Sequence, residues 1–288
     1  MNDIKPQVSI LTTVYNREKY LIDCITSVQN GHFQDYEHII VDDRSTDSSL
    51  AIAQEMATLD ERIQVHLNEE NLGDYPNRNK AASFATGTYL KYLDADDFHG
   101  RWTLDIMVDA MELYPEAGLG LVDHKIQYQP LLISGKEAFE QYYSGKSNLF
   151  HRSPLSAMIR RASFESIGGF QSEPFTGDYN LWHRLASQSP VVIFPNSLLF
   201  WRDHDDQQST INNANPIHQL SHLLARIDNL KNSKFPIEPN LREHNLEKAY
   251  RQLARTILVH IRRGNWPAAQ EVRKHLGWTW RKVFITSR

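Results

Sequence analysis

The sequence has few of the features that mark secreted, membrane-spanning or nucleic-acid-binding proteins. Its single cysteine, Cys24, excludes an internal disulfide and gives no reason to expect an oxidising compartment. Met1–Gln7 does not show the basic-then-apolar pattern of a signal peptide, and apolar runs such as Val8–Val14 have only the length of a strand. The formal net charge of -4 provides no excess of basic residues. We therefore expect a cytoplasmic protein that does not bind nucleic acid.

The sequence also has no internal repeat, no low-complexity tract and no glycine-rich loop after its first predicted strand. That loop, Val14–Glu18, contains no glycine. A nucleotidyltransferase also combines a parallel sheet with a divalent metal and carboxylates, but it is expected to bind phosphate through a glycine-rich loop at this place. A nucleotidyltransferase therefore stays an alternative that this loop disfavours. Cys24 falls in a helical pattern, where a buried, unreactive side chain is expected.

Strand and helix patterns alternate over the first hundred residues. Hydrophobic residues make up 41% of the 288 residues and charged ones 23%, which is ordinary for a globular protein. The alternation predicts an α/β fold with a Rossmann-like, mostly parallel sheet flanked by helices. In such sheets ligands bind beyond the carboxyl ends of the strands. Strands are predicted at Val8–Val14, Tyr36–Val41, Ile63–Leu67 and Thr88–Leu93, and helices at Arg17–Gln29, Ser48–Leu59 and Pro76–Ala85.

The remaining chain is predicted to be helical at its end. A helix is expected from Phe98 to Tyr114, and the stretch Asp123–Pro154 is expected to be loops with a short helix around Lys136–Tyr143. The polar loop Asp203–Pro216 would close the catalytic core. We therefore expect a catalytic domain over residues 1–215, with a nucleotide-binding half at about 1–100 and an acceptor half at about 101–215. A C-terminal helical extension would follow over residues 216–288.

Apolar residues in this extension recur at helical spacing in two stripes, one from Leu220 to Leu230 and one from Leu246 to Ile261. We expect the stripes to pack on the core or on each other rather than to form a partner-binding groove. Trp278, Trp280 and Phe284, with the basic residues near them, leave open a peripheral contact with the inner face of a membrane.

Three carboxylates occur within four residues directly after the fourth predicted strand: Asp94, Asp96 and Asp97. Unpaired, they would repel one another. Clustered carboxylates at a strand end suit Mn²⁺ or Mg²⁺, which prefer oxygen ligands shared with phosphates. The alternative is an acidic turn that caps a helix beginning near Phe98.

With these carboxylates, the sequence resembles glycosyltransferase family 2, the inverting transferases of the GT-A fold. The resemblance extends from Val8 to about Ser209. Its motifs occur in the family's order: Val8–Asn16, Ile40–Asp47, Asn71–Gly73, Arg78–Asn79, Asp94–Asp97, Ile167–Phe170, Gly177–Trp182 and Trp201–His204.

The resemblance implies that Thr13, Tyr15, Asp43, Arg78 and Asp94 bind the donor nucleotide. A carboxylate can accept a hydrogen bond from the imide N–H of uracil or thymine, and a tyrosine ring can stack on a base. A UDP-linked sugar is therefore the expected donor. Without the resemblance, Tyr15 would be a helix-entry residue and Asp43 a loop cap.

The resemblance further implies that Asp96 and His204 bind the metal, and that Arg202 binds the phosphates. A neutral imidazole is a common ligand of Mn²⁺, and a guanidinium pairs well with phosphate. The alternative for His204 is a solvated loop histidine, since the chain has 13 histidines.

Asp178 matches the family's catalytic base, which takes the proton of the acceptor hydroxyl. Many relatives have Glu before this Asp, whereas this chain has Gly177. The alternative for Asp178 is an N-cap of a helix Tyr179–Ala186.

The predicted function is therefore a metal-dependent, inverting glycosyltransferase of the hexosyltransferase type (EC 2.4), active in polysaccharide biosynthesis. Its expected partners are a nucleotide-sugar donor and a glycan or lipid-linked saccharide acceptor. Gly177 leaves open a non-catalytic sugar-nucleotide-binding protein. The sequence does not specify the sugar, the acceptor or the oligomeric state.

Overall fold

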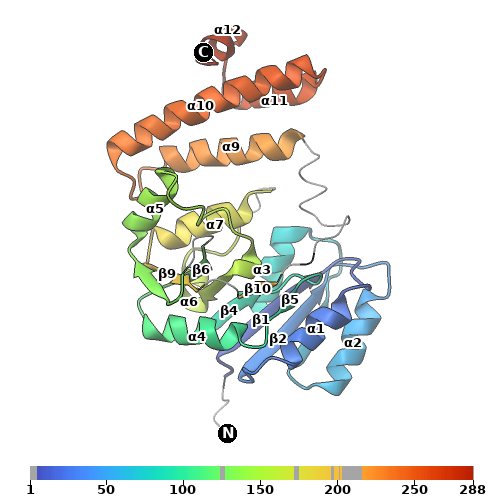
Figure 1. Ribbon diagram of the computed structural model, residues 1–288. Helices are drawn as coiled ribbons and strands as arrows, with labels where there is room; N and C mark the ends of the chain where they lie inside the picture. Colours follow the sequence, from blue (N-terminus) through green and yellow to red (C-terminus); the bar gives the residue numbers. More distant parts are fainter. Residues whose placement is uncertain are drawn as a thin grey trace. The chain divides into compact units, whose positions relative to one another are not determined.

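A mixed β-sheet organises the first part of the chain (Figure 1). The computed structural model describes residues 5–123, 127–171, 175–195, 198–200, 202 and 216–287. In these ranges, eight strands join in the order β3-β2-β1-β4-β8-β6-β9-β7. The strands are β1 Val8–Val14, β2 Tyr36–Asp42, β3 Ile63–Leu67, β4 Tyr89–Tyr92, β6 Leu119–Val122, β7 Leu131–Ile133, β8 Ala157–Arg160 and β9 Val191–Phe194.

Strands β1 to β4 are parallel, as their alternation with helices predicts. Val14 is paired with Asp42, and Leu11 with Tyr92, so that β1, β2 and β4 end at one edge of the sheet. The four predicted strands are confirmed to within two residues. The helices between them are α1 Leu21–Gln29, α2 Ser49–Leu59 and α3 Asp74–Phe84.

The second half of the sheet includes antiparallel strands. Strand β8 pairs antiparallel with β4 and β6, and β7 pairs antiparallel with β9. The predicted mostly parallel sheet is confirmed as an α/β sheet of mixed direction. The short helix expected after Lys136 is confirmed as α5, whereas β7 before it was not predicted. The helical elements of this half are α4 Thr103–Leu113, α5 Gly135–Tyr143, the 3-10 turn η1 Pro154–Ser156, α6 Arg161–Ser166 and α7 Gly177–Ala186.

The helix predicted from Phe98 to Tyr114 is wrong over its first turn. Phe98–His99 form strand β5, which pairs antiparallel with β10 (Leu199–Phe200). Helix α4 begins only at Thr103, whose hydroxyl donates to the carbonyl of Leu198 over 2.9 Å. Strand pairing with a segment about a hundred residues away replaces the local helical preference there.

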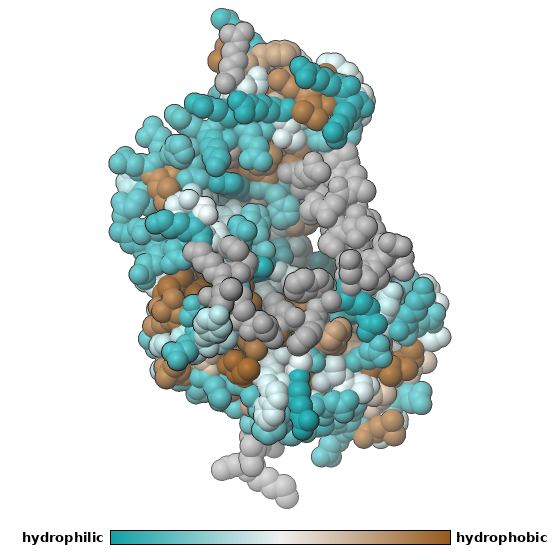
Figure 2. Space-filling model, viewed as in Figure 1, coloured by the Kyte–Doolittle hydropathy of each residue, from teal (hydrophilic) through white to brown (hydrophobic). Residues whose placement is uncertain are grey.

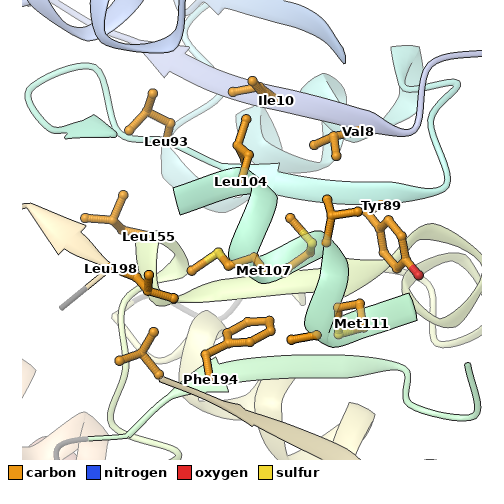
Figure 3. Packing of buried hydrophobic residues seen from close by; sticks show 14 of the residues in the cluster. Val8, Ile10, Tyr89, Leu93, Leu104, Met107, Met111, Leu155, Phe194 and Leu198 are labelled. Carbon is orange, nitrogen blue, oxygen red and sulfur yellow. The ribbon is translucent and has the colours of Figure 1, made fainter. Parts of the chain in front are cut away.

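Helix α4 covers one face of the sheet and builds a hydrophobic core there (Figure 3). Leu104, Met107 and Met111 of α4 pack with Val8 and Ile10 of β1 in this cluster. The expected burial of Cys24 is confirmed, and Trp182 is buried as well. Trp182 is fully buried and donates through Nε1 to the carbonyl of Arg152 over 2.8 Å. Cys24 is buried in α1, and burial raises the pKa of its thiol, so the thiolate is disfavoured.

Contacts divide the chain into two compact units: Met1–Ser172 with Gly177–Arg202, and Glu173–Thr176 with Asp203–Arg288. From Pro216 onward, the described secondary structure of the second unit consists of helices. Ile227 and Leu230 of α9, and Leu253 and Ile257 of α10, are buried, and α9 packs against α10. On the face shown in Figure 2, hydrophobic residues form small groups among hydrophilic ones. The helices of this unit are α9 Pro216–Lys231, α10 Pro239–Arg262, α11 Trp266–His275 and α12 Trp280–Thr286.

Candidate active site

The residues predicted to bind the donor lie at the carboxyl edge of the parallel strands. Thr13 is the second-to-last residue of β1. Tyr15 directly follows that strand, and 48% of its surface is exposed. Asp43 follows β2, and its N–H donates to the carbonyl of Val14 over 2.8 Å. Asp94 follows β4. Because the strands are parallel and end together, residues far apart in the sequence meet at this edge.

Asp43 is buried and is held by the loop that precedes α3. Its Oδ1 accepts from the side chain of Asn68 and from the N–H of Leu72, both over 2.8 Å, and its Oδ2 accepts from the N–H of Gly73 over 2.9 Å. Gly73 has φ of 81°, which a side chain would disfavour. The side chain of Asn71 donates to the carbonyl of Asp43. Asn71 and Gly73 thus shape the loop, and Asn68 is a partner that the sequence did not indicate.

Two of the three carboxylates of the acidic cluster form ion pairs with arginines, which compensates part of the expected repulsion. Asp94 Oδ1 lies 2.8 Å from Arg78 Nη2, and Asp96 Oδ2 lies 3.1 Å from Arg17 Nε. Asp97 is buried and accepts from the backbone N–H of Arg202 over 3.0 Å. Burial and the neighbouring charges of Asp94 and Asp96 raise the pKa of Asp97 to about 7.

Arg78 connects two acidic segments. It is buried on α3, where its Nε lies 2.7 Å from Oδ1 of Asp74 and its Nη2 reaches Asp94. Burial opposes the charge of Arg78, but the two carboxylates outweigh it and raise its pKa well above the ordinary value. Arg78, which was predicted to bind the donor, is thus paired with the acidic cluster in the structure. Asp74 was not predicted, because helix α3 begins two residues earlier than the sequence pattern indicated.

Asp178 lies in the first turn of α7. The helix begins at Gly177, so Asp178 is inside it rather than at an N-cap before Tyr179. Its Oδ1 accepts from the N–H of Tyr179 over 2.8 Å and from the hydroxyl of Tyr75 over 3.4 Å. Burial raises the pKa of Asp178 to about 6, although the Tyr179 N–H and the charge of Arg78 lower it. A carboxyl with that pKa is suited to proton transfer near neutral pH.

Arg202 and His204 were predicted beside the diphosphate. The guanidinium of Arg202 pairs with Asp23 of α1 over 2.8 Å and lies over the ring of Tyr20, 5.1 Å from its centroid. Its backbone also contacts Asp97, which ties the segment to the acidic cluster. His204 lies outside the described residues.

The donor set at the end of β4 fits a cation that is shared with a bound phosphate. Within the described ranges, no three His, Cys, Asp or Glu side chains come together as a closed metal site. Mg²⁺ and its relatives are commonly held by one or two carboxylates with substrate phosphates completing the shell. In the structure, the guanidinium groups of Arg78 and Arg17 pair with Asp94 and Asp96. These two carboxylates therefore already interact with positive charge at the place where a metal ion would bind.

Comparison with known proteins identifies the family. The pattern of glycosyl transferase family 2 matches residues 9–168, which is more than half of the chain. The chain belongs to glycosyl transferase family 2. The resemblance predicted from the motifs is confirmed, and so is the enzyme class. The motifs beyond residue 168 lie outside the matched range.

A relative from Bacillus subtilis carries the provisional name teichuronic acid biosynthesis glycosyltransferase TuaG. It is 40% identical over 116 residues, which are 40% of this chain and 45% of that protein. This chain thus spans about half the length of that relative.

Two solved structures share the fold. The Staphylococcus aureus protein TarS (residues 1–349, with UDP-GlcNAc) has a TM-score of 0.67 at 15% identity, over 95% of this chain and 93% of that one. The mannosyltransferase PcManGT from Pyrobaculum calidifontis, with GDP-Man and Mn²⁺, has a TM-score of 0.62 at 18% identity, over 96% and 81%. The predicted GT-A fold is confirmed. None of the helices in the described ranges combines the length and apolar composition that crossing a membrane requires.

Proposed function

We propose that this protein is an inverting glycosyltransferase that moves a sugar from a UDP-linked donor to an acceptor hydroxyl, with Asp178 as general base. One observation carries the proposal: Arg78 pairs directly with Asp94 of the donor edge and lowers the pKa of Asp178. The charge of the buried Arg78 side chain thus acts both on the candidate base, Asp178, and on the acidic cluster. A base must lie beside the reacting centre to remove a proton there.

The donor's base would lie against Tyr15, with Thr13 and Asp43 beside it. The exposed ring of Tyr15 offers a stacking face, and Asp43 is fixed by three hydrogen bonds. A rigid acceptor recognises an imide N–H at low entropic cost. This supports uracil over adenine, which has no such N–H. UDP-GlcNAc in TarS and GDP-Man in the mannosyltransferase support a nucleotide-sugar donor in general.

The diphosphate would lie over the acidic cluster. Asp96 and His204 are the proposed ligands of Mn²⁺ or Mg²⁺, with Arg202 near the phosphates. When bound, the cation neutralises negative charge on the diphosphate. Mn²⁺ in the mannosyltransferase structure supports this assignment.

The transfer itself is a single displacement. Asp178 takes the proton of the acceptor hydroxyl while the acceptor oxygen forms a bond to the anomeric carbon. The bond from that carbon to the phosphate oxygen breaks, and its electron pair leaves with the nucleoside diphosphate. Attack and departure on opposite faces invert the anomeric configuration.

The acceptor is proposed to be a glycan or a lipid-linked saccharide. The name of the TuaG relative, which refers to teichuronic acid biosynthesis, supports a polysaccharide pathway. Of the aromatic residues expected at a membrane surface, Trp278 is buried, whereas Phe284 is exposed. Phe284 and the exposed Trp266 support a peripheral contact at the inner face of a membrane, where a lipid-linked acceptor would be reached.

A donor screen tests the proposal. The protein is incubated with UDP-, GDP- and dTDP-sugars, Mn²⁺ and saccharide acceptors, and release of nucleoside diphosphate and glycoside product is measured. We expect release from a UDP-sugar by the wild type. Pyrophosphate formed from a nucleoside triphosphate would instead indicate a nucleotidyltransferase, and binding without release would indicate a non-catalytic protein.

A further inference from the structure

Tyr75 occupies the space beside the residue that precedes Asp178. A Cβ added to Gly177 would lie 2.7 Å from Cδ1, Cε1 and Cε2 of the Tyr75 ring. Cε1 and Cε2 lie on opposite edges of the six-membered ring, and the added carbon would be equally far from both. It would therefore lie over the face of the ring rather than beside one edge. Position 177 therefore has no room for a side chain while Tyr75 keeps this place.

The ring of Tyr75 is fixed by its surroundings. It stacks with Phe170, with ring centroids 5.3 Å apart and an angle of 22° between planes. Tyr75 lies in the first turn of α3, next to Asp74 and one turn from Arg78. A ring that packs on a glycine and on another ring has little freedom, so its hydroxyl is directed to one place.

That hydroxyl donates to Oδ1 of Asp178 over 3.4 Å. Burial and the charges of Asp178 and Asp74 raise the pKa of Tyr75, so the phenol stays protonated and acts as a donor. The Tyr179 N–H donates to the same oxygen. Both of these donors bond Oδ1, so neither occupies Oδ2, the oxygen to which we assign the incoming proton.

We infer that Tyr75 is a positioning residue for Asp178: its ring fills the space that a side chain at position 177 would need, and its hydroxyl donates to one carboxylate oxygen so that the other can face the acceptor. The inference rests on the proposed function, since it assumes that Asp178 is the base.

The first test measures the titration of the Asp178 carboxyl group by NMR and requires no enzyme turnover. The protein is labelled with ¹³C at the aspartate carboxyls, and the Asp178 resonance is assigned by its loss in Asp178→Asn. The charged groups near this carboxyl, Asp74 and Arg78, are retained in every variant. Because a donated hydrogen bond favours the ionised form, Tyr75→Phe should raise the midpoint of the Asp178 titration by on the order of half a pH unit.

Tyr92→Phe is the matched control. Tyr92 belongs to the same aromatic group, 5.5 Å from Phe170, but its hydroxyl donates to the carbonyl of Arg78. This variant should leave the Asp178 midpoint unchanged. An unchanged midpoint in Tyr75→Phe, or an equal shift in both variants, would overturn the inference.

The second test measures the packing. Gly177→Ala should lower Tm in the wild-type background and should not lower it in Tyr75→Ala, where the ring is absent. Equal losses of Tm in both backgrounds would overturn the inference. Neither test needs a turnover assay, so a protein that transfers no sugar would contradict the proposed function while both tests of Tyr75 still give an answer.

Discussion

Arg78 is the residue on which the charge balance of the site depends most. It is buried between Asp74, at the start of α3, and Asp94, after β4. Among the described residues, no other ion pair connects the start of α3 with the acidic cluster. Removing one partner of such a pair leaves the other charges uncompensated in a region of low dielectric. Arg78 was predicted from its motif, but its partner Asp74 was not.

We therefore expect Arg78→Met to lower the free energy of unfolding by about 1 to 3 kcal/mol, less than for fully buried pairs because both carboxylates keep some solvent contact. Urea unfolding measures it. Arg251→Met is the control, since Arg251 forms an i,i+4 pair with Glu247 in which both side chains are more than half exposed. That variant should change stability by less than about 0.5 kcal/mol. Equal effects of the two substitutions would contradict the role of Arg78.

Asp178 provides the pH dependence. Its pKa of about 6 lies above the ordinary 3.8, so the base is ionised above about pH 6 and becomes protonated below it. We expect kcat/KM to fall about tenfold per pH unit below that midpoint, and Asp178→Asn to reduce transfer by roughly a hundred- to ten-thousand-fold. Initial rates from pH 5 to 9 provide the measurement.

Stability distinguishes a catalytic from a structural Asp178. Because its pKa is raised on folding, ionised Asp178 disfavours the folded state, and this cost appears as pH rises from about 4 to 6. Asp178→Asn should therefore be no less stable than the wild type at pH 8, while inactive. A variant that transfers sugar at the wild-type rate would rule out Asp178 as the base.

How far single residues could be predicted depends on where their partners lie in the sequence. Asp43, Asp94 and Asp178 stand in motifs, and the motifs located them. Tyr75 was missed because its partners Phe170 and Asp178 are about a hundred residues away, and no local pattern records such a contact.

The helices and strands show a similar division. The four strands of the first half were predicted because each is a run of β-branched and apolar residues bounded by polar loops. Strands β5 and β10 have two residues each, too few to display a period, and their pairing arises from tertiary contact. Helix α3 begins at Asp74, two residues before the predicted start at Pro76, because proline is typical of the first helical position but is also accepted within the first turn.

Helix α5 begins with a capping box, in which two hydrogen bonds join the N-cap residue and the third helical residue. The Ser134 side chain accepts from the N–H of Glu137, and the Glu137 side chain accepts from the N–H of Ser134. We expect Ser134→Ala to lower the free energy of unfolding by about 1 kcal/mol, because an N–H loses its partner. Ser144→Ala at the other end of α5 should change it by less than about 0.5 kcal/mol. Thermal or urea unfolding of both variants measures the difference, and equal losses would contradict the capping role.

The folded molecule as a whole should respond to its ligand through the acidic cluster. A ligand that binds only the folded state stabilises it by mass action, by about 2.7 kcal/mol at a concentration a hundred times its Kd. For a protein of this size that corresponds to a rise in Tm of roughly 4 to 5 °C. The rise should be larger for UDP than for ADP, because adenine offers no imide N–H to Asp43.

The rise in Tm should also depend on the metal. Asp96 pairs with Arg17 over 3.1 Å, so a bound cation would replace one positive partner by a divalent one that also neutralises the diphosphate. We expect UDP to raise Tm with Mn²⁺ and much less in a chelator, and Asp96→Ala to remove that difference. Asp109→Ala, an exposed aspartate on α4, should keep it. Equal stabilisation by UDP with Mn²⁺ and in chelator would show that binding does not use a metal, and loss of the difference in Asp109→Ala as well would show a general effect of charge.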